Sequence, residues 1–350
     1  MSPGLPRGED DGRLALSPSL PAPHFTHLRR MTDLTGLWEH ARYTTPRVEH
    51  GYCTDDNARA LVVVCRQPDP GSELIDLTRI YLKFLQDAAL PGGGFHNRRN
   101  ADGSWADGVG SDDSQGRAIW GLGVAARLAP EDWIRSASFE LFERQTRFDP
   151  PSLRASSFAL FGAAEVLAVA PGHAPTRQAI ERWSGQIRVG DDPSWPWPER
   201  RLAYDNARIP EAIQTAGVAL EDDRLVDSGI RLLEWLVATQ TRGGHFSYAP
   251  SGGWGSGEPR PGFDQQPVET AAMADACSRA FFLTGDDLWR HRVVSAARWL
   301  LGDNDGGTVL YDVDSGGCCD GLTPTGVNLN QGAESTLSAL IALQQAIRCS

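Results

Sequence analysis

Residues 51–64 read GYCTDDNARALVVV, in which two adjacent carboxylates, Asp55 and Asp56, stand directly before a run of Ala, Leu and Val. An apolar run without a polar face predicts a helix that is buried on every side. Carboxylates at a helix start can cap its free N–H groups, and their charge suits the positive end of the helix dipole. Capping would explain one such start. The alternative is a functional site at the helix end. This alternative gains weight because the pattern recurs along the chain.

Five further segments share this design: they are rich in Ala, Gly and Ser, nearly all apolar, and polar only where they begin. They cover residues 111–123, 154–167, 205–220, 267–281 and 332–343. Helices of this kind are surrounded by other helices, and small residues allow the close contacts that such packing needs. The sequence therefore predicts six buried helices.

Amphipathic segments alternate with the buried ones, with apolar residues three and four apart and charged residues between them. They cover residues 24–33, 74–89, 130–146, 174–188, 222–240 and 286–302. This alternation predicts an all-α fold, an (α/α)6 toroid with an inner ring of helices inside an outer ring. A tandem-repeat solenoid would require a fixed period, which is absent. Short strands are predicted in the loops at 243–249 and 308–314.

Composition narrows the class of protein and its partners. The chain has 350 residues, 41% hydrophobic and 22% charged, with a net charge of −12. Without a basic stretch or an apolar run of roughly 20 residues, we expect neither nucleic acid nor a membrane as partner. The Pro-rich residues 1–23 are predicted to be a flexible tail, residues 24–350 a single toroid domain, and the protein cytoplasmic.

The six cysteines lack the regular spacing of a disulfide framework or a zinc site. We interpret them as reduced thiols, although the pair Cys318 and Cys319 beside Asp320 leaves a soft-metal site as the weaker alternative. HExxH, GxxxxGK[ST], GxGxxG and GxSxG motifs are absent. We therefore predict no metal and no cofactor.

In a toroid of this kind all the inner helices begin at the same end, so their polar starts would meet at the mouth of one cavity. Glu269 and Glu334 lie inside their helices and are flanked by Ala, Val or Thr, so burial would raise their pKa toward that of a general acid. The sequence predicts one of them as the acid and Asp113 or Asp56 as the base, a division of roles that residue types leave open.

Substrate binding is predicted for the other polar residues at the helix starts and for two ring side chains in the loops. These residues are Asp55, Asn57, Arg59, Asp112, Arg117, Asp205, Asn206, Gln266, Asn330, Gln331, His96 and Trp254. Aromatic rings beside amides and carboxylates suit a sugar, but loop aromatics also pack on the rim of a barrel. Both interpretations remain open at this point.

Four stretches carry a resemblance to a known family. They are HLRRMTDLTGLWEHARYTTPRVEHGYCTDDNARAL, GSDDSQGRAIWGLG, FDQQPVETAAMADA and GGCCDGLTPTGVNLNQGAEST. Over residues 24–345 the chain resembles bacterial (α/α)6 proteins that are placed with the six-hairpin glycosidases. These proteins occur alone or attached to the C-terminal side of family-4-type glycosyltransferases. The resemblance implies metal-free sugar chemistry by acidic residues at the toroid mouth, and a functional link to a glycosyltransferase.

The expected function is a metal-independent glycoside hydrolase, with inversion, that cleaves a short oligosaccharide or glycoside between two carboxyl groups. A glycoside phosphorylase, with Arg59 or Arg117 binding phosphate, is one alternative. A non-catalytic glycan-binding partner of a glycosyltransferase is another. A sugar epimerase would need histidines on the inner helices, and the predicted inner helices contain none.

Overall fold

The computed structural model describes residues 20–350, so most of the tail expected over residues 1–23 lies outside the described part. Twelve helices account for most of the described chain. In order they are α1 (Thr26–Arg30), α2 (Thr54–Arg66), α3 (Ser72–Ala88), α4 (Asp112–Leu128), α5 (Asp132–Glu143), α6 (Leu153–Val169), α7 (Ala174–Ser184), α8 (Arg208–Leu220), α9 (Asp223–Thr239), α10 (Pro267–Thr284), α11 (Asp287–Trp299) and α12 (Ala333–Arg348).

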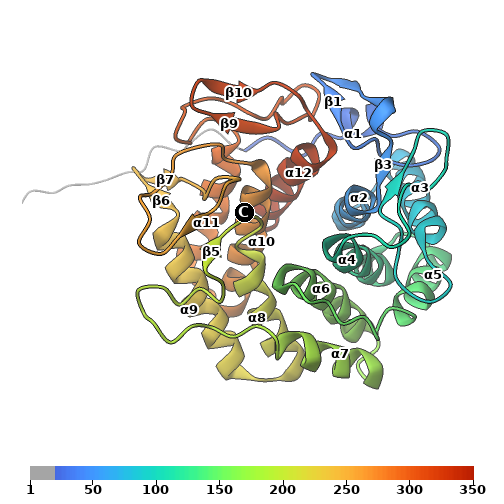
Figure 1. Cartoon of the computed structure of the whole chain (residues 1–350), viewed down its shortest axis with the longest axis horizontal. Helices are drawn as coiled ribbons and strands as arrows, with labels where there is room; N and C mark the ends of the chain where they lie inside the picture. The colour runs from blue at the N-terminus through green and yellow to red at the C-terminus, as the bar shows by residue number, and fades with distance from the viewer. Residues whose placement is uncertain (1–19) are drawn as a thin grey trace, which may run out of the picture.

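The even-numbered helices form an inner ring, and the odd-numbered helices surround it (Figure 1). Each inner helix packs against the next one, and α12 returns to α2 to close the ring. The predicted (α/α)6 toroid is confirmed. The sixth outer position is held only by the short α1, which packs against α12.

The inner helices are buried along most of their length, as their composition predicts. The closest packing joins α4 and α6, where glycines face each other. A Cβ placed on Gly162 would lie 2.1 Å from the Ile119 carbonyl oxygen, and one on Gly123 would lie 2.1 Å from the Gly162 carbonyl oxygen. The small residues therefore let two helix backbones touch.

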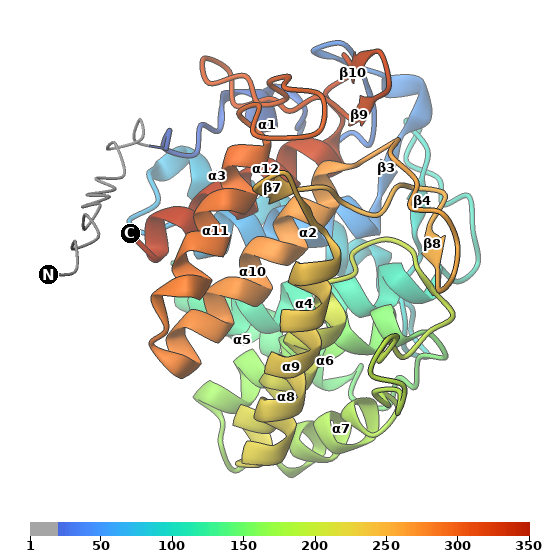
Figure 2. The ribbon, with the colours of Figure 1, turned by 90° about the vertical axis from the view of Figure 1, so that its left-hand side faces the viewer.

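Short antiparallel strand pairs lie in the loops at the end where the inner helices begin (Figure 2). They are β1 (Ala41–Arg42) with β2 (Thr45–Pro46), β3 (Tyr52–Cys53) with β4 (Arg98–Arg99), β5 (Arg201–Leu202) with β8 (Trp254–Gly255), β6 (Thr241–Arg242) with β7 (His245–Phe246), and β9 (Gly321–Thr323) with β10 (Gly326–Asn328).

The hairpin expected at 243–249 is present, as β6 and β7. The strand expected at 308–314 is not formed, because this segment keeps only one isolated bridge, from Tyr311 to Cys318. Its backbone binds the end of α11 instead: the N–H groups of Leu310 and Tyr311 both donate to the Leu300 carbonyl. Its alternating pattern reflects packing of a loop against a helix end.

All six cysteines are free and buried. Burial raises the pKa of the Cys318 and Cys319 thiols, an effect that the nearby Asp320 adds to. The free state of all six agrees with the interpretation as reduced thiols, and the soft-metal alternative at Cys318 and Cys319 is not tested by these contacts. Among residues 20–350, no helix is long and apolar enough to span a membrane.

The helix caps correct the first interpretation of the acidic starts. Side-chain caps on the inner helices come from Cys53 on α2, Ser111 on α4 and Ser152 on α6. Neither Asp55–Asp56 nor Asp112–Asp113 supplies the capping side chain, because Asp55 lies two positions and Asp112 one position after the N-cap residue of its helix. These four carboxylates are thus available for contacts other than capping.

Candidate active site

A cavity of about 730 Å³ opens at the end of the toroid where the inner helices begin. Every inner helix or the segment just before it contributes to the lining. The lining residues are Glu39, His40, Cys53, Asp55, Asp56, Arg59, Asn97, Arg98, Ser111, Asp112, Asp113, Ser152, Tyr204, Gln266, Asp320, Asn328, Gly332, Glu334 and Ser335. The expected convergence of helix starts on one cavity is present.

The charge of this cavity is strongly unbalanced. Seven carboxyl side chains line it, against two guanidinium groups, Arg59 and Arg98. Arg98 is already paired with Glu39. Crowding of like charges raises the pKa of some members of such a group, so that protonated and ionised carboxyls can coexist.

Arg59 forms ion pairs with three carboxylates, and we call this group the Arg59 junction. Its Nη2 lies 2.5 Å from Asp55 and 2.7 Å from Glu334, and its Nη1 lies 3.1 Å from Asp56. Glu334 comes from α12, so the contact joins the last inner helix to the first. One guanidinium thus separates the Asp56 and Glu334 carboxyls by at most about 8 Å, within the range of glycosidase carboxyl pairs.

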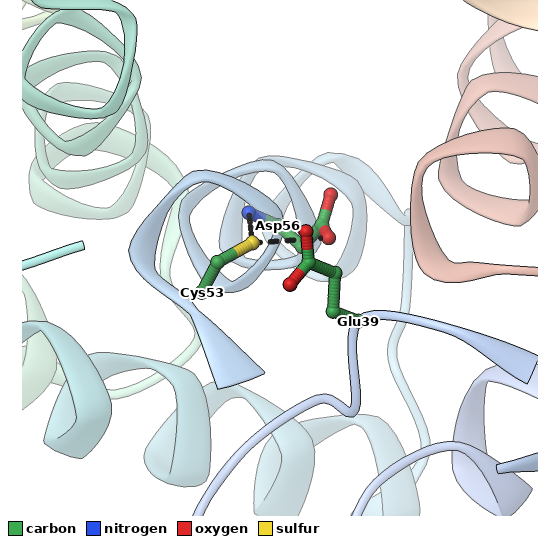
Figure 3. A group of neighbouring side chains, drawn as sticks. All are labelled: Glu39, Cys53 and Asp56. Carbon is green, nitrogen blue, oxygen red and sulfur yellow. Dashed lines mark hydrogen bonds between the residues drawn. The ribbon is translucent and has the colours of Figure 1, made fainter. Parts of the chain in front are cut away.

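Asp56 is the buried member of this group. Burial raises the pKa of its carboxyl to about 7, against the opposing effect of Arg59, and the charges of Asp55 and Glu334 add to the rise. The Cys53 thiol donates to Asp56 Oδ2 at 3.1 Å and accepts from the Asp56 N–H (Figure 3). Asp56 is therefore part-protonated at neutral pH and held in one orientation.

Glu39 lies beside Cys53 and Asp56, and ligand atoms of the three are within 4.8 Å of one another (Figure 3). Burial raises the pKa of the Cys53 thiol, and the Asp56 charge adds to this effect. A metal would need the thiolate. We interpret Cys53 and Asp56 as a hydrogen-bonded pair beside Glu39, and the expectation of no metal stays a prediction.

Two more carboxyls with raised pKa line the cavity. Burial raises the pKa of Asp113, whose carboxylate accepts from the Tyr204 hydroxyl at 2.5 Å. Burial also raises the pKa of Asp320, which accepts from the Gly332 N–H at 2.8 Å and the Ser335 hydroxyl at 2.9 Å. Asp320 thereby orients the start of α12.

A line of buried ion pairs runs from the cavity into the ring. Arg117 bridges Asp55 at 3.0 Å and Asp205 at 2.7 Å, and Arg208 lies 3.6 Å from Asp205. Although burial works in the other direction, Arg117 and Arg208 hold the pKa of Asp205 below its usual value. Arg117 and Asp205 do not line the cavity, so they position Asp55 and are not placed to touch a substrate.

Glu269 is buried under the cavity and does not line it. Burial raises the pKa of Glu269 to about 7, with a further contribution from Asp205. Its Oε2 accepts from the Asn206 side chain at 3.0 Å, and Asn206 also accepts from Arg154 at 3.2 Å. The predicted rise in pKa is present at Glu269, but its carboxyl is buried and does not line the cavity.

Eight of the twelve predicted substrate-binding residues do not line the cavity: Arg117, Asp205 and Asn206, described above, and five more. Asn57 is buried and binds the backbone of Leu37 and Cys53. The rings of His96 and Trp254 pack on Trp105 and Trp195, respectively. Asn330 binds the Tyr43 N–H, and Gln331 is buried beside Gly317. Asn57, His96 and Trp254 contact the surrounding loops. For Trp254, the structure therefore favours packing on the rim over sugar binding. Asp55, Arg59, Asp112 and Gln266 do line the cavity.

Several cavity residues were missed by the sequence analysis. Glu39, Tyr204 and Asp320 are in loops and Arg98 is in the short strand β4, so helical periodicity carries no information about them. A signal existed for Tyr204, because it precedes the DNAR stretch that echoes TDDNAR. Glu39 and Asp320 lie in the stretches that carry the family resemblance.

No protein-family model and no curated protein matches the chain. Solved structures of the same fold do. A sugar epimerase from a ruminal bacterium is 13% identical with a TM-score of 0.69, covering 93% of this chain and 95% of the other. Cellobiose 2-epimerase from Bacillus thermoamylovorans B4167 is 11% identical with a TM-score of 0.71, covering 93% and 96%.

A third similar structure is an α-1,6-mannanase of Salegentibacter sp. HEL1_6 with bound α-1,6-mannotetrose, in a variant inactivated by replacing two adjacent aspartates with alanine. It is 11% identical with a TM-score of 0.61, covering 93% of this chain and 96% of the other. At such identities the likeness establishes the fold, which is that of the six-hairpin (α/α)6 toroids.

Proposed function

We propose that this protein is a metal-independent glycoside hydrolase that acts on an oligosaccharide or glycoside at the mouth of the toroid. The observation that carries the proposal is the Arg59 junction, which places a part-protonated carboxyl, Asp56, near an ion-paired one, Glu334. Environments that push two carboxyls toward different protonation states are how a site obtains an acid and a base.

The geometry supports a different division of roles from the one that residue types suggested. Asp56 is the proton donor to the leaving oxygen, because it is the cavity carboxyl whose pKa is raised to about 7. Glu334 is the base, because its half-exposed carboxylate can reach a water molecule. Glu269 is too deeply enclosed for either role. A separation of at most about 8 Å allows the spacing that inversion requires.

Two features of known structures and of this chain support sugar chemistry. The similar structures are enzymes that act on sugars, and the mannanase is inactive without two adjacent aspartates. In this chain both adjacent pairs, Asp55–Asp56 and Asp112–Asp113, line the cavity. The hydroxyl and carboxylate groups of the cavity are suitable partners for sugar hydroxyls.

Phosphorolysis has less support. Arg59 already has three carboxylate partners, and Arg117 lies behind the lining between Asp55 and Asp205. Carboxylates already occupy both terminal nitrogens of Arg59 and the Nη2 of Arg117, and the surplus of carboxylates in the cavity would repel phosphate.

A sugar epimerase or isomerase is the second candidate, favoured by one residue. His40 lines the cavity, and burial together with the neighbouring His50 lowers the pKa of its imidazole. A neutral imidazole can abstract a proton from carbon. The inner helices carry no histidine, and His40 would therefore need a carboxyl as its partner.

Incubation with a panel of oligosaccharides, with and without phosphate, tests these functions in one experiment. We expect phosphate-independent release of a reducing sugar, with inverted anomeric configuration by proton NMR at early times. A sugar phosphate as product would indicate the phosphorylase. An isomeric sugar of unchanged mass would indicate the epimerase, and binding without turnover would indicate the glycan-binding protein.

A further inference from the structure

A second cavity, of about 580 Å³, lies at the opposite end of the toroid, where the inner helices end. We call it the closed-end pocket. Figure 2 shows the C-terminus at this end, away from β3, β4 and β8. Its lining includes Arg66 from α2, Val218 from α8, Phe282 from α10 and Arg348 from α12. None of these residues belongs to the proposed active site.

The floor of the closed-end pocket holds more guanidinium groups than carboxyls. Asp275 pairs with Arg66 at 2.9 Å and Arg208 at 2.5 Å, and Glu211 pairs with Arg208 at 2.9 Å. Arg279 reaches Glu211 only at 3.8 Å. Among residues 20–350, no carboxylate lies within 4.0 Å of Arg348, which stacks on Phe282. Beside the matched pair Arg127–Glu165, three lining guanidinium groups, Arg66, Arg279 and Arg348, thus face two lining carboxyls, and Arg208 behind the lining pairs with both of these carboxyls.

Two residues that line this pocket also carry unpartnered polar atoms. Gln345 is only 4% exposed, and its Nε2 donates to Asp275 while its Oε1 has no hydrogen-bond partner among the described residues. The Arg279 Nε is likewise unpartnered within residues 20–350. Buried polar groups without partners are costly, and their presence in a cavity points to a polar ligand.

The rim of the closed-end pocket is apolar. Leu128, Val218, Phe282, Leu283 and Ile347 line it, and each is between 37% and 52% exposed. Large apolar side chains that gather around one hollow mark a binding surface more often than isolated ones do.

We propose that the closed-end pocket binds a small amphiphilic anion. Its carboxylate or phosphate group binds Arg279 and Arg348, and its apolar part packs on Phe282, Leu283 and Ile347. Guanidinium groups bind such oxyanions through paired hydrogen bonds, and the cavity volume is that of a small-molecule site. The proposal does not depend on glycoside hydrolysis.

Isothermal titration of the intact chain with octyl phosphate, below its micelle concentration, tests the proposal. We expect octyl phosphate to bind at least about tenfold more tightly than inorganic phosphate, because two buried methylenes already contribute about a factor of ten. It should also bind at least about tenfold more tightly than 1-octanol, because the alcohol has no anionic group for Arg279 and Arg348. Arg348→Met and Arg279→Met should each weaken binding of octyl phosphate by about tenfold or more. Arg224→Met, an exposed position on α9, is the matched control and should leave it unchanged.

Phe282→Ala provides a second test at a half-exposed position. It should remove much of the advantage of octyl phosphate over inorganic phosphate. Equal affinities for octyl phosphate and octanol would overturn the anion site, and binding unaffected by both Arg variants would overturn its location. Flotation with phosphatidylglycerol vesicles, without binding of monomeric octyl phosphate, would overturn a small-molecule ligand in favour of a lipid surface.

Discussion

Asp56 acquires its chemistry from its neighbours. The Cys53 thiol, the Arg59 guanidinium and the charge of Glu334 all act on one carboxyl that is 4% exposed. A carboxyl in water would be ionised at pH 7, whereas burial leaves this one with a pKa of about 7. That value suits a general acid at physiological pH.

Asp56→Asn removes the ionisable proton and keeps the shape of the side chain. If Asp56 is the acid, turnover should fall by about 10²-fold or more, the scale of general acid catalysis. The melting temperature should not fall, because the helix cap is the Cys53 side chain. Steady-state kinetics and thermal unfolding on the same preparation test this. Normal turnover in the variant would remove Asp56 from the mechanism.

The pH dependence of kcat/KM is a separate prediction. The acid must be protonated, so activity should decline as pH rises through about 7, the pKa of Asp56. It should also decline at low pH, where the base takes up a proton, which gives a bell-shaped profile. Activity that keeps rising to pH 9 would contradict a carboxyl donor.

At the scale of single helices, α10 carries the other carboxyl with a strongly raised pKa. Glu269 binds about one proton more in the folded than in the unfolded protein between the usual pKa of Glu, about 4.3, and its folded pKa of about 7. Since the folded state holds the extra proton, the free energy of unfolding decreases as pH rises through this window.

Glu269→Gln should remove that decrease, because the amide oxygen can still accept from Asn206. Relative to the unmodified protein, the variant should gain up to about 1.4 kcal/mol of stability per pH unit across the window. Urea unfolding at pH 5, 6, 7 and 8 measures the difference. Parallel stability curves for the two proteins would show that the Glu269 pKa is unshifted.

The contact of α4 with α6 makes a prediction about packing. Gly162→Ala would place a Cβ 2.1 Å from the Ile119 carbonyl oxygen, so the helices must separate. Overpacking of this kind costs about 1–3 kcal/mol, and more where backbone is the obstacle. Gly172→Ala, where nothing lies within 4 Å, is the control and should change stability little. Chemical denaturation of both variants gives the comparison.

At the scale of the whole molecule, buried ion pairs connect inner helices that are not adjacent in the ring. Asp275 on α10 contacts Arg66 on α2, Arg208 on α8 and Gln345 on α12. Against the effect of burial, Arg66 and Arg208 hold its pKa below the usual value, so it is a charged hub.

Asp275→Ala should destabilise the fold by about 3–5 kcal/mol, because it leaves buried guanidinium groups without a partner. Asp287→Ala is the control: it breaks an exposed pair with Arg290 on a single helix and should cost less than about 1 kcal/mol. Denaturant midpoints of the two variants decide the matter. Equal midpoints would mean that the hub adds nothing to ring stability.

The architecture was readable from the chain because burial of a helix dictates its residue types around the whole circumference. Six segments with small apolar residues and six with one charged face are enough to predict two concentric rings. The same reasoning made the first outer helix too long, since α1 covers only Thr26–Arg30. It also predicted a strand at 308–314, where a loop packs on a helix end and shows the same alternation of polar and apolar residues.

The site was only partly readable, because protonation and access depend on neighbours that are distant in sequence. Glu269 and Asp56 looked alike as acids near helix starts, yet Asp56 lines the cavity and Glu269 lies behind it. Arg59 joins α2 to α12 across 275 positions of sequence. The sequence by itself determined the toroid and the end at which its polar helix starts meet. Tertiary structure alone decided which carboxyls face the cavity, because closing the ring sets their distances and their burial.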